Sequence, residues 1–316
     1  MQDRIQAALA QINDVVLGKQ AQIRLALCCL LSGGHLLLED LPGMGKTTLA
    51  HALAGVMGLS FRRIQFTSDL LPADILGGSV FDPSTGQFRF HEGPVFCQVL
   101  MADEINRATP RTQSALLEAM EEGQVSMDGE TRQLPVPFFV IATQNPSELA
   151  GTFPLPESQT DRFLMRLSLG YPDRAAERQL LLQPDLRLTP QSANTCLDAD
   201  DLKHWQRMLM QVHLSDAVLD YIQRLIDFSR QSSRIDLGLS PRGGLAIVRA
   251  ARCHALMAGR DHVTPDDVQA VFVAVADHRL GGMDNLRPLT EQTDKKIDTD
   301  RTLAEWILDS VNVLPG

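Results

Sequence analysis

The spacing of hydrophobic and polar positions along the chain changes near residue 171. Before that point, short apolar runs alternate with stretches of helical periodicity, such as 47–57 and 112–122. The apolar runs cover residues 35–38, 95–102 and 137–142. Runs that are apolar on both faces are typical of the buried strands of a parallel sheet, whose crossover connections are helices. The first part of the chain therefore predicts an α/β fold with a parallel sheet flanked by helices.

After residue 171 the pattern predicts helices only. Helical spacing covers residues 199–210, 215–232, 241–257 and 265–276. Two of these helices begin with a capping residue followed by proline, at Ser240-Pro241 and Thr264-Pro265, which is a strong start signal. Residues 281–300 are polar and irregular, and a short helix follows around 303–311. We expect three parts: an α/β core over 1–171, a helical domain over 172–280, and a linker with a short C-terminal helix over 281–316.

Composition narrows the class of protein. The chain has 316 residues, of which 44% are hydrophobic and 22% charged, and its formal net charge is −10. These proportions exclude a disordered or collagen-like chain, and the negative charge argues against a nucleic-acid or polybasic membrane binder. The five cysteines have no CxxC spacing, which favours reduced core thiols over a disulfide framework. The longest apolar run, 25–31, is far short of the roughly 20 residues that a membrane helix needs. We expect a cytoplasmic protein without membrane insertion.

A glycine-containing loop joins the first predicted strand to a helix. Its sequence is Pro42-Gly43-Met44-Gly45-Lys46-Thr47-Thr48. Such a loop points backbone N–H groups at phosphates, Lys46 would reach the β- and γ-phosphates, and the Thr47 hydroxyl would ligate Mg²⁺. An ordinary glycine turn is the alternative, and a dinucleotide fingerprint would leave Lys46-Thr47 without a role. The strict motif has glycine where Asp40 stands. Because that position precedes the residues that wrap the phosphates, we expect ATP binding to be retained.

Adjacent carboxylates follow another apolar strand, at Asp103-Glu104. A carboxylate at the C-terminal end of a strand can hold Mg²⁺ through water, and its neighbour can activate the attacking water. An isolated Asp-Glu pair is more often a solvated strand end. Its order after the phosphate loop makes ATP hydrolysis with Mg²⁺ the leading hypothesis. In contrast, we expect Glu121-Glu122, at the end of a predicted helix, to be solvated.

Several long motifs resemble the MoxR family of AAA+ ATPases. They are the runs 65–74, 103–122, 141–146 and 155–163 and the tripeptide Ser240-Pro241-Arg242. The resemblance extends from about residue 14 to about residue 280, nearly the whole chain. It implies a P-loop AAA+ core, with the phosphate loop as Walker A and Asp103-Glu104 as Walker B, followed by an all-helical lid domain. It also implies a homo-oligomer, a hexameric ring in this family, that remodels a protein client and often works with a separate vWA-domain partner.

The resemblance also assigns further site residues. Asn145 matches sensor 1, which orients the lytic water beside Glu104; the start of an Asn-Pro turn is the alternative, and the two roles can coexist. Arg162 matches the arginine finger that reaches the neighbouring subunit's site; a surface salt bridge with Asp161 is the alternative. Arg242 matches sensor 2, and a cation in the first turn of a helix opposes the helix dipole. Val16 and Gly18 match the stretch lining the adenine pocket, where core packing explains them equally well.

Two segments resemble insertions of this AAA+ subgroup that face the ring centre or surface. Residues 66–94 match the helix-2 insert, and residues 124–135, with Asp128-Gly129 as a turn signal, match the hairpin before sensor 1. Plain surface loops are an equal alternative. Two other functions use the same nucleotide site: a nucleotide-gated binding switch with little turnover, and a nucleic-acid motor, against which the net charge argues.

Overall fold

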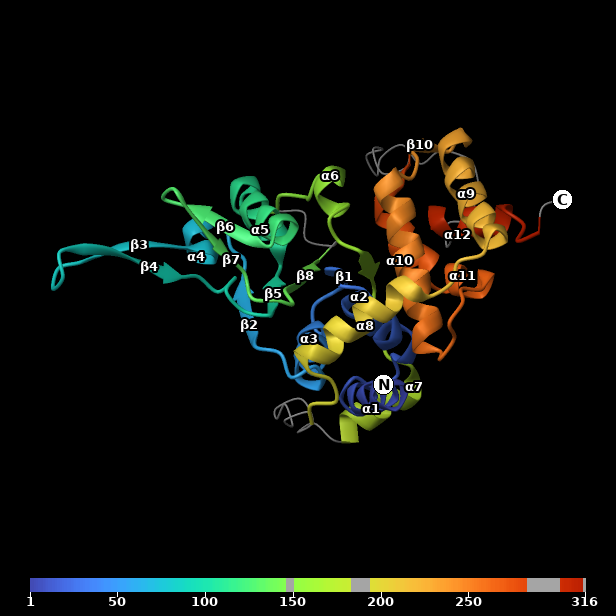
Figure 1. Cartoon of the computed structure of the whole chain (residues 1–316), viewed down its shortest axis with the longest axis horizontal. Helices are drawn as coiled ribbons and strands as arrows, with labels where there is room; N and C mark the ends of the chain where they lie inside the picture. The colour runs from blue at the N-terminus through green and yellow to red at the C-terminus, as the bar shows by residue number, and fades with distance from the viewer. Residues whose placement is uncertain (146–150, 183–193, 283–301, 315–316) are drawn as a thin grey trace.

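A parallel sheet forms the centre of the first part of the chain (Figure 1). The computed structural model describes residues 1–145, 151–182, 194–282 and 302–314. Within them, five parallel strands pair in the order β2-β5-β8-β1-β9. Their bounds are β1 Leu36–Glu39, β2 Phe61–Gln65, β5 Val99–Asp103, β8 Phe139–Gln144 and β9 Met165–Leu167. The predicted α/β fold is confirmed, and the three apolar runs supply the three central strands.

Alternating side chains of the central strands enter two separate hydrophobic clusters. Leu36 and Leu38 pack in the cluster that includes helices α1 (Gln2–Val15), α2 (Gln20–Leu31) and α3 (Lys46–Val56). Leu37 points to the opposite face, into the cluster of α4 (Pro72–Leu76) and α5 (Pro110–Glu122). Both faces of the sheet are therefore covered, which explains the continuous apolar runs in the sequence. Two short elements lie nearby, the 3₁₀ helix η1 (Ile105–Arg107) and α6 (Glu157–Thr160).

Two hairpins extend from this core. The first consists of β3 (Gly77–Asp82) and β4 (Gln87–Glu92), and it projects farther from the sheet than any other labelled strands in Figure 1. The second consists of β6 (Gln124–Met127) and β7 (Glu130–Gln133). Its turn residues Asp128 and Gly129 both have positive φ, at 54° and 79°, as a two-residue type I′ turn requires. The hairpin predicted over 124–135 is confirmed.

Helices make up most of the second part of the chain. They are α7 (Arg174–Leu182), α8 (Ala199–Gln211), α9 (Asp216–Gln231), α10 (Pro241–Met257), α11 (Pro265–Ala276), the 3₁₀ helix η3 (Asp277–Arg279) and α12 (Leu303–Ser310). Helix α10 begins where the sequence predicts, because the Ser240 hydroxyl accepts a hydrogen bond from the Gly243 N–H at 3.1 Å. One short antiparallel ladder, β10 (Ile235–Leu237) with β11 (Gly281–Gly282), was not predicted. Most of the predicted 281–300 linker lies outside the described residues.

Two expectations from composition concern the whole fold. The five cysteines are all free thiols, and four of them are buried, as predicted for core cysteines. In the described part of the chain, no helix has the length and apolarity that crossing a lipid bilayer requires.

Candidate nucleotide site

The phosphate loop connects β1 to α3 at the carboxyl edge of the sheet. Gly43 and Gly45 have φ values of 84° and 91°, in the region that residues with a Cβ rarely adopt. A Cβ at either position would meet no other atom within 4 Å, so backbone conformation rather than space requires glycine here. Helix α3 starts directly at Lys46, and its first N–H groups face the loop without partners inside the helix. Of the other predicted residues, Pro42 and Met44 lie in the loop, and Thr47 and Thr48 lie in the first turn of α3.

The Lys46 side chain lies inside the loop. Its ammonium group donates hydrogen bonds to the backbone carbonyls of Asp40 and, at 3.2 Å, Leu41. Desolvation lowers the pKa of Lys46, while the charges of Asp40, Asp103 and Glu104 act in the opposite direction. The structure therefore brings the predicted lysine and both predicted carboxylates into one electrostatic site.

Asp103 ends the central strand β5 and is buried. Its Oδ1 accepts a hydrogen bond from the Thr143 hydroxyl at 2.6 Å, and its Oδ2 accepts one from the Arg63 Nε at 3.1 Å. Arg63 lies on the edge strand β2 and about half of its side chain is exposed. The predicted metal ligand is thus paired with a cation in the free chain.

Glu104 follows Asp103 in a left-handed conformation with φ 55°, which is uncommon for a residue other than glycine. Its backbone N–H donates to the Thr143 hydroxyl at 2.8 Å, so Thr143 holds both carboxylate residues. Its Oε2 accepts a hydrogen bond from Gln65 at 2.7 Å and pairs with Arg107 at 2.8 Å. Glu104 therefore lies just beyond the end of β5, and its charge acts on Lys46 of the phosphate loop.

Asn145 directly follows the strand β8, which pairs with β5 on one side and β1 on the other. It is buried, with 4% of its surface exposed. The carboxyl ends of parallel strands meet at one sheet edge, so Asn145, Glu104 and the phosphate loop share that edge.

The donor set suits Mg²⁺ better than a transition metal. Thr47 offers a hydroxyl and Asp103 a carboxylate, and Mg²⁺ prefers such oxygen ligands while keeping several waters and substrate phosphates. No group of three or more His, Cys, Asp or Glu is placed to hold a metal among the residues that the structure describes.

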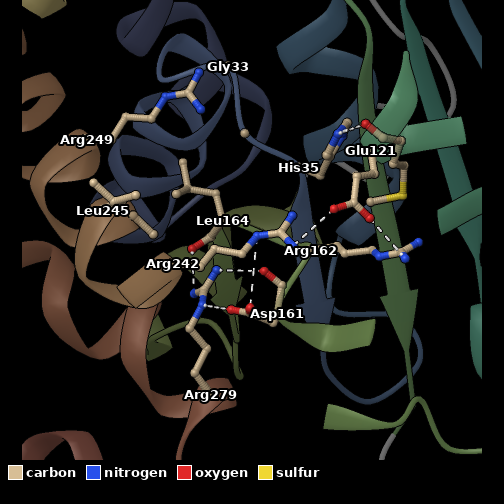
Figure 2. A pocket seen from close by; sticks show the side chains of 13 residues that line it. Gly33, His35, Glu121, Asp161, Arg162, Leu164, Arg242, Leu245, Arg249 and Arg279 are labelled. Atoms are coloured by element: carbon tan, nitrogen blue, oxygen red, sulfur yellow. Dashed lines mark hydrogen bonds and ion pairs between the residues drawn. The ribbon is translucent and has the colours of Figure 1, made fainter. Parts of the chain in front are cut away.

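Arg162 and Arg242 lie together at the amino edge of the sheet, away from the phosphate loop. Arg162 precedes β9, and Arg242 lies in the first turn of α10. Figure 2 shows both guanidinium groups reaching the Glu121 carboxylate, Arg162 at 3.0 Å and Arg242 at 3.3 Å, each on a different oxygen. Glu121 is exposed, as expected for a helix end, and its carboxylate also pairs with both arginines, which the sequence did not predict.

A cavity of about 280 Å³ opens between these side chains. Four arginines line it, Arg162, Arg242, Arg249 and Arg279, together with the carboxylates of Glu121 and Asp161. Asp161 pairs with Arg279 at 2.6 Å, so the predicted Arg162–Asp161 salt bridge is replaced by Arg162–Glu121. The cavity carries an excess of positive charge, which suits an anionic group.

Val16 and Gly18 lie at the end of α1. Val16 is buried in the cluster that contains α1 to α3. A Cβ on Gly18 would lie 2.7 Å from that of Ala176 in α7, so a close helix contact requires glycine there. These contacts account for both residues through packing.

The sequence did not predict the three residues that hydrogen-bond to Asp103 and Glu104. Gln65 and Arg63 are on β2, and Thr143 is on β8, one strand from the carboxylates. The only signal was position, since the three residues come at or near strand ends that parallel pairing brings to one edge.

The loop, the adjacent carboxylates and the buried asparagine on one sheet edge have the arrangement expected of a P-loop ATPase. A family model described as "ATPase family associated with various cellular activities (AAA)" matches residues 35–165, and one for the "AAA lid domain" matches residues 227–300. The crystal structure of a Cytophaga hutchinsonii protein assigned as an ATPase superimposes with a TM-score of 0.85 at 33% identity, covering 98% of this chain and 95% of that one.

Three relatives with similar sequences agree with these matches. The uncharacterized protein YeaC of Bacillus subtilis is 45% identical over 273 residues, 86% of this chain and 85% of YeaC. Chaperone MoxR1 of Mycobacterium tuberculosis is 38% identical over 320 residues, 98% of this chain and 84% of that protein. Protein MoxR of Paracoccus denitrificans is 34% identical over 301 residues, 88% of each. The chain belongs to the MoxR family of AAA+ ATPases.

Proposed function

We propose that this chain is the subunit of a ring-forming ATPase in which arginines of one subunit complete the ATP site of the next. The supporting observation is the placement of Arg162 and Arg242 at the amino edge of the sheet. The phosphate loop leaves the opposite edge, and the four residues of β1 between them span about 13 Å. Two clustered arginines that face away from their own phosphate loop suit a neighbour's γ-phosphate. This gives Arg162 the finger role, and Arg242 acts beside it from the lid.

Within one subunit, the carboxyl edge supplies the remaining groups. Lys46 binds the β- and γ-phosphates, and the N–H groups at the start of α3 bind the same anion. Glu104 accepts a proton from the attacking water, and Asn145 orients that water. The water oxygen then bonds to the γ-phosphorus while the bond to the β,γ-bridging oxygen breaks. Thr47 and Asp103 would hold Mg²⁺, which supplies charge neutralisation of the phosphates.

We also propose a division of labour along the chain. The core over 1–171 binds nucleotide, the lid over 172–280 carries Arg242, and 281–316 is a linker with α12. The client-contacting elements are the two hairpins, because the β3–β4 hairpin exposes Val80, Phe81 and Phe88, with 72% of Phe88 accessible. A hexameric ring, a protein client and a vWA-domain partner complete this proposal, which follows the family resemblance.

Mixing two inactive variants tests the shared site. Lys46→Ala removes the phosphate ligand, and Arg162→Ala removes the finger. If sites are shared, a mixed ring regains activity wherever an Arg162→Ala subunit faces a Lys46→Ala neighbour, at about a quarter of the sites for random heterologous contacts in an equal mixture. If each subunit carries a complete site, the mixture stays as inactive as its parts.

Two controls complete this experiment. Wild-type turnover per subunit must rise with protein concentration as the subunits assemble, because an isolated subunit lacks the arginine finger of a neighbour. Arg162→Ala must assemble to the same mass as wild type, by sedimentation, for its inactivity to count. Flat specific activity from dilute to concentrated protein would refute the shared site.

A second candidate function is supported by the contacts around the carboxylates. Arg63 holds Asp103, and Gln65 and Arg107 hold Glu104. These contacts favour slow turnover in the free chain and suit a nucleotide-gated switch that a partner turns on. ATP binding with near-zero turnover at every protein concentration would support the switch over the ring ATPase.

A further inference from the structure

Asp40 stands at the first position of the phosphate loop, where the strict motif has glycine. Residues 41–43 that follow it are exposed, yet only 7% of Asp40 is accessible to solvent. A buried carboxylate is costly unless hydrogen bonds satisfy its oxygens. Its partners therefore show what the aspartate does there.

The Asp40 carboxylate accepts three hydrogen bonds from one segment, Ser168–Gly170. Oδ1 accepts from the Ser168 hydroxyl at 2.8 Å and from the Gly170 N–H at 3.1 Å, and Oδ2 accepts from the Leu169 N–H. Both oxygens act purely as acceptors, as an ionised carboxylate requires. This segment directly follows the edge strand β9 and leads toward α7 and the lid. The carboxylate thus fastens the start of the phosphate loop to the end of the core.

The backbone of Asp40 makes two further hydrogen bonds, one of them with Lys46 of the phosphate loop. Its carbonyl accepts a hydrogen bond from the Lys46 ammonium group, and its N–H donates to the Gln144 carbonyl at 3.2 Å. Asp40 therefore links three elements: the lysine, the neighbouring strand β8, and the segment after β9. Moving its backbone would move the lysine.

The preceding residue strengthens this attachment. Glu39 pairs with Arg166 of β9 at 3.0 Å, and Arg166 also contacts Asp277 at the start of η3 in the lid. Glu39 therefore holds the edge strand β9 itself, and Asp40 holds the segment that directly follows it.

We propose that Asp40 is a positioning residue of the phosphate loop, whose carboxylate fixes the loop to Ser168–Gly170 and thereby sets the place of Lys46 for ATP. The inference rests on the proposed function in that it takes this loop as the ATP site. Glycine at this position, although it restores the strict motif, would leave the buried Leu169 N–H without its acceptor. Asparagine would turn an NH₂ donor toward a backbone N–H.

The experiment compares ATP affinity among Asp40→Gly, Asp40→Asn, Ser168→Ala and wild type. The dissociation constant is measured by fluorescent-ATP titration at a temperature well below the unfolding midpoint of every variant. Both Asp40 variants are expected to weaken binding about tenfold or more, equivalent to about 1.4 kcal/mol. Ser168→Ala, which removes one of three donors and leaves the N–H pair, is expected to weaken it less than threefold.

Asp267→Asn is the matched control. Asp267 is also a buried carboxylate with several donors, among them Arg260 and Thr264, but it lies at the start of α11 in the lid. It is expected to lower the unfolding temperature while leaving the ATP affinity within twofold of wild type. If Asp267→Asn lost as much ATP affinity as the Asp40 variants, the effect of Asp40 would reflect overall stability alone, and the proposal would be overturned.

The outcomes separate this inference from the proposed function. If wild type binds ATP and Asp40→Gly binds it equally well, the positioning role is wrong and the ATPase assignment stands. If Asp40→Gly does not fold, Asp40→Asn decides: wild-type affinity in that variant would overturn the inference. If wild type itself binds no ATP, the proposed function fails, and the inference fails with it.

Discussion

Replacing Glu104 by glutamine is the sharpest test of the hydrolytic site. Glutamine has the same length, so it fits the left-handed backbone position and the strand end held by Thr143. What disappears is the carboxylate that we propose takes the proton from water. The groups proposed to bind the phosphates, Lys46 and the loop N–H groups, are untouched.

The expected size of the effect follows from the role of the side chain. A positioned general base contributes typically about 10²–10⁴-fold in rate, or about 2.7–5.5 kcal/mol of barrier. About 27% of the Glu104 side chain is exposed, so water reaches this carboxylate in the folded chain. We therefore expect kcat to fall by about 10²-fold or more. ATP affinity is expected to change by less than about threefold, because Glu104 contacts no phosphate in this assignment.

The assay is phosphate release at saturating ATP, with ATP affinity measured in parallel by titration. Glu118→Gln is the matched control, because Glu118 is an exposed carboxylate on α5 with no role in the site. Its turnover is expected to equal that of wild type. Wild-type turnover in Glu104→Gln would refute the base assignment, whereas loss of ATP binding would show that Glu104 supports the site structurally.

Three further predictions concern residues around the two sheet edges. Gln65→Ala removes one of the two contacts on the Glu104 carboxylate and leaves Arg107, so basal ATP turnover is expected to rise about twofold or more in a steady-state assay. An unchanged rate would refute the restraint by Gln65. Desolvation lowers the pKa of His35 to about 4, so between pH 6.5 and 4 the unfolded chain binds more protons than the folded one. Acid therefore destabilises the wild type through this residue. When the pH falls from 7.5 to 5.5, the unfolding free energy from urea titrations should drop by about 1 kcal/mol more in wild type than in His35→Leu. Asp267→Ala leaves the Arg260 guanidinium without its buried partner and should lower the unfolding free energy by about 3 kcal/mol, and a loss below 1 kcal/mol would contradict it.

Local sequence signals predicted the elements of the fold well where they agreed with packing. Helix α10 has the predicted bounds, because a capping serine and a proline define its start independently of tertiary contacts. The run 95–102 predicted the strand β5 four residues too early, since apolarity marks burial and not hydrogen-bonded pairing. The β10–β11 ladder gave no periodic signal, because a two-residue strand is too short to show one.

The parts of the site that the sequence predicted are those whose residues lie close together in the chain. The phosphate loop needs glycines at fixed offsets before a helix, and Lys46 follows them in sequence. The grouping of Arg162 with Arg242 depends on how the lid packs against the amino edge, and no spacing encodes that. The residues that restrain the carboxylates, such as Gln65, follow only from strand order, which places β2 beside β5.

Two acidic residues show why a local sequence pattern does not predict every contact of the site. Glu121 looked like a solvated helix end, and Asp40 like a tolerated departure from a motif. Their partners are 121 positions away for Arg242 and 128 for Ser168. A carboxylate takes its role from the donors that surround it, and here folding brings those donors from the lid and from the far end of the core. Each therefore joins segments that are distant in sequence: Glu121 pairs with Arg162 and Arg242, and Asp40 ties the phosphate loop to the segment that leads into the lid.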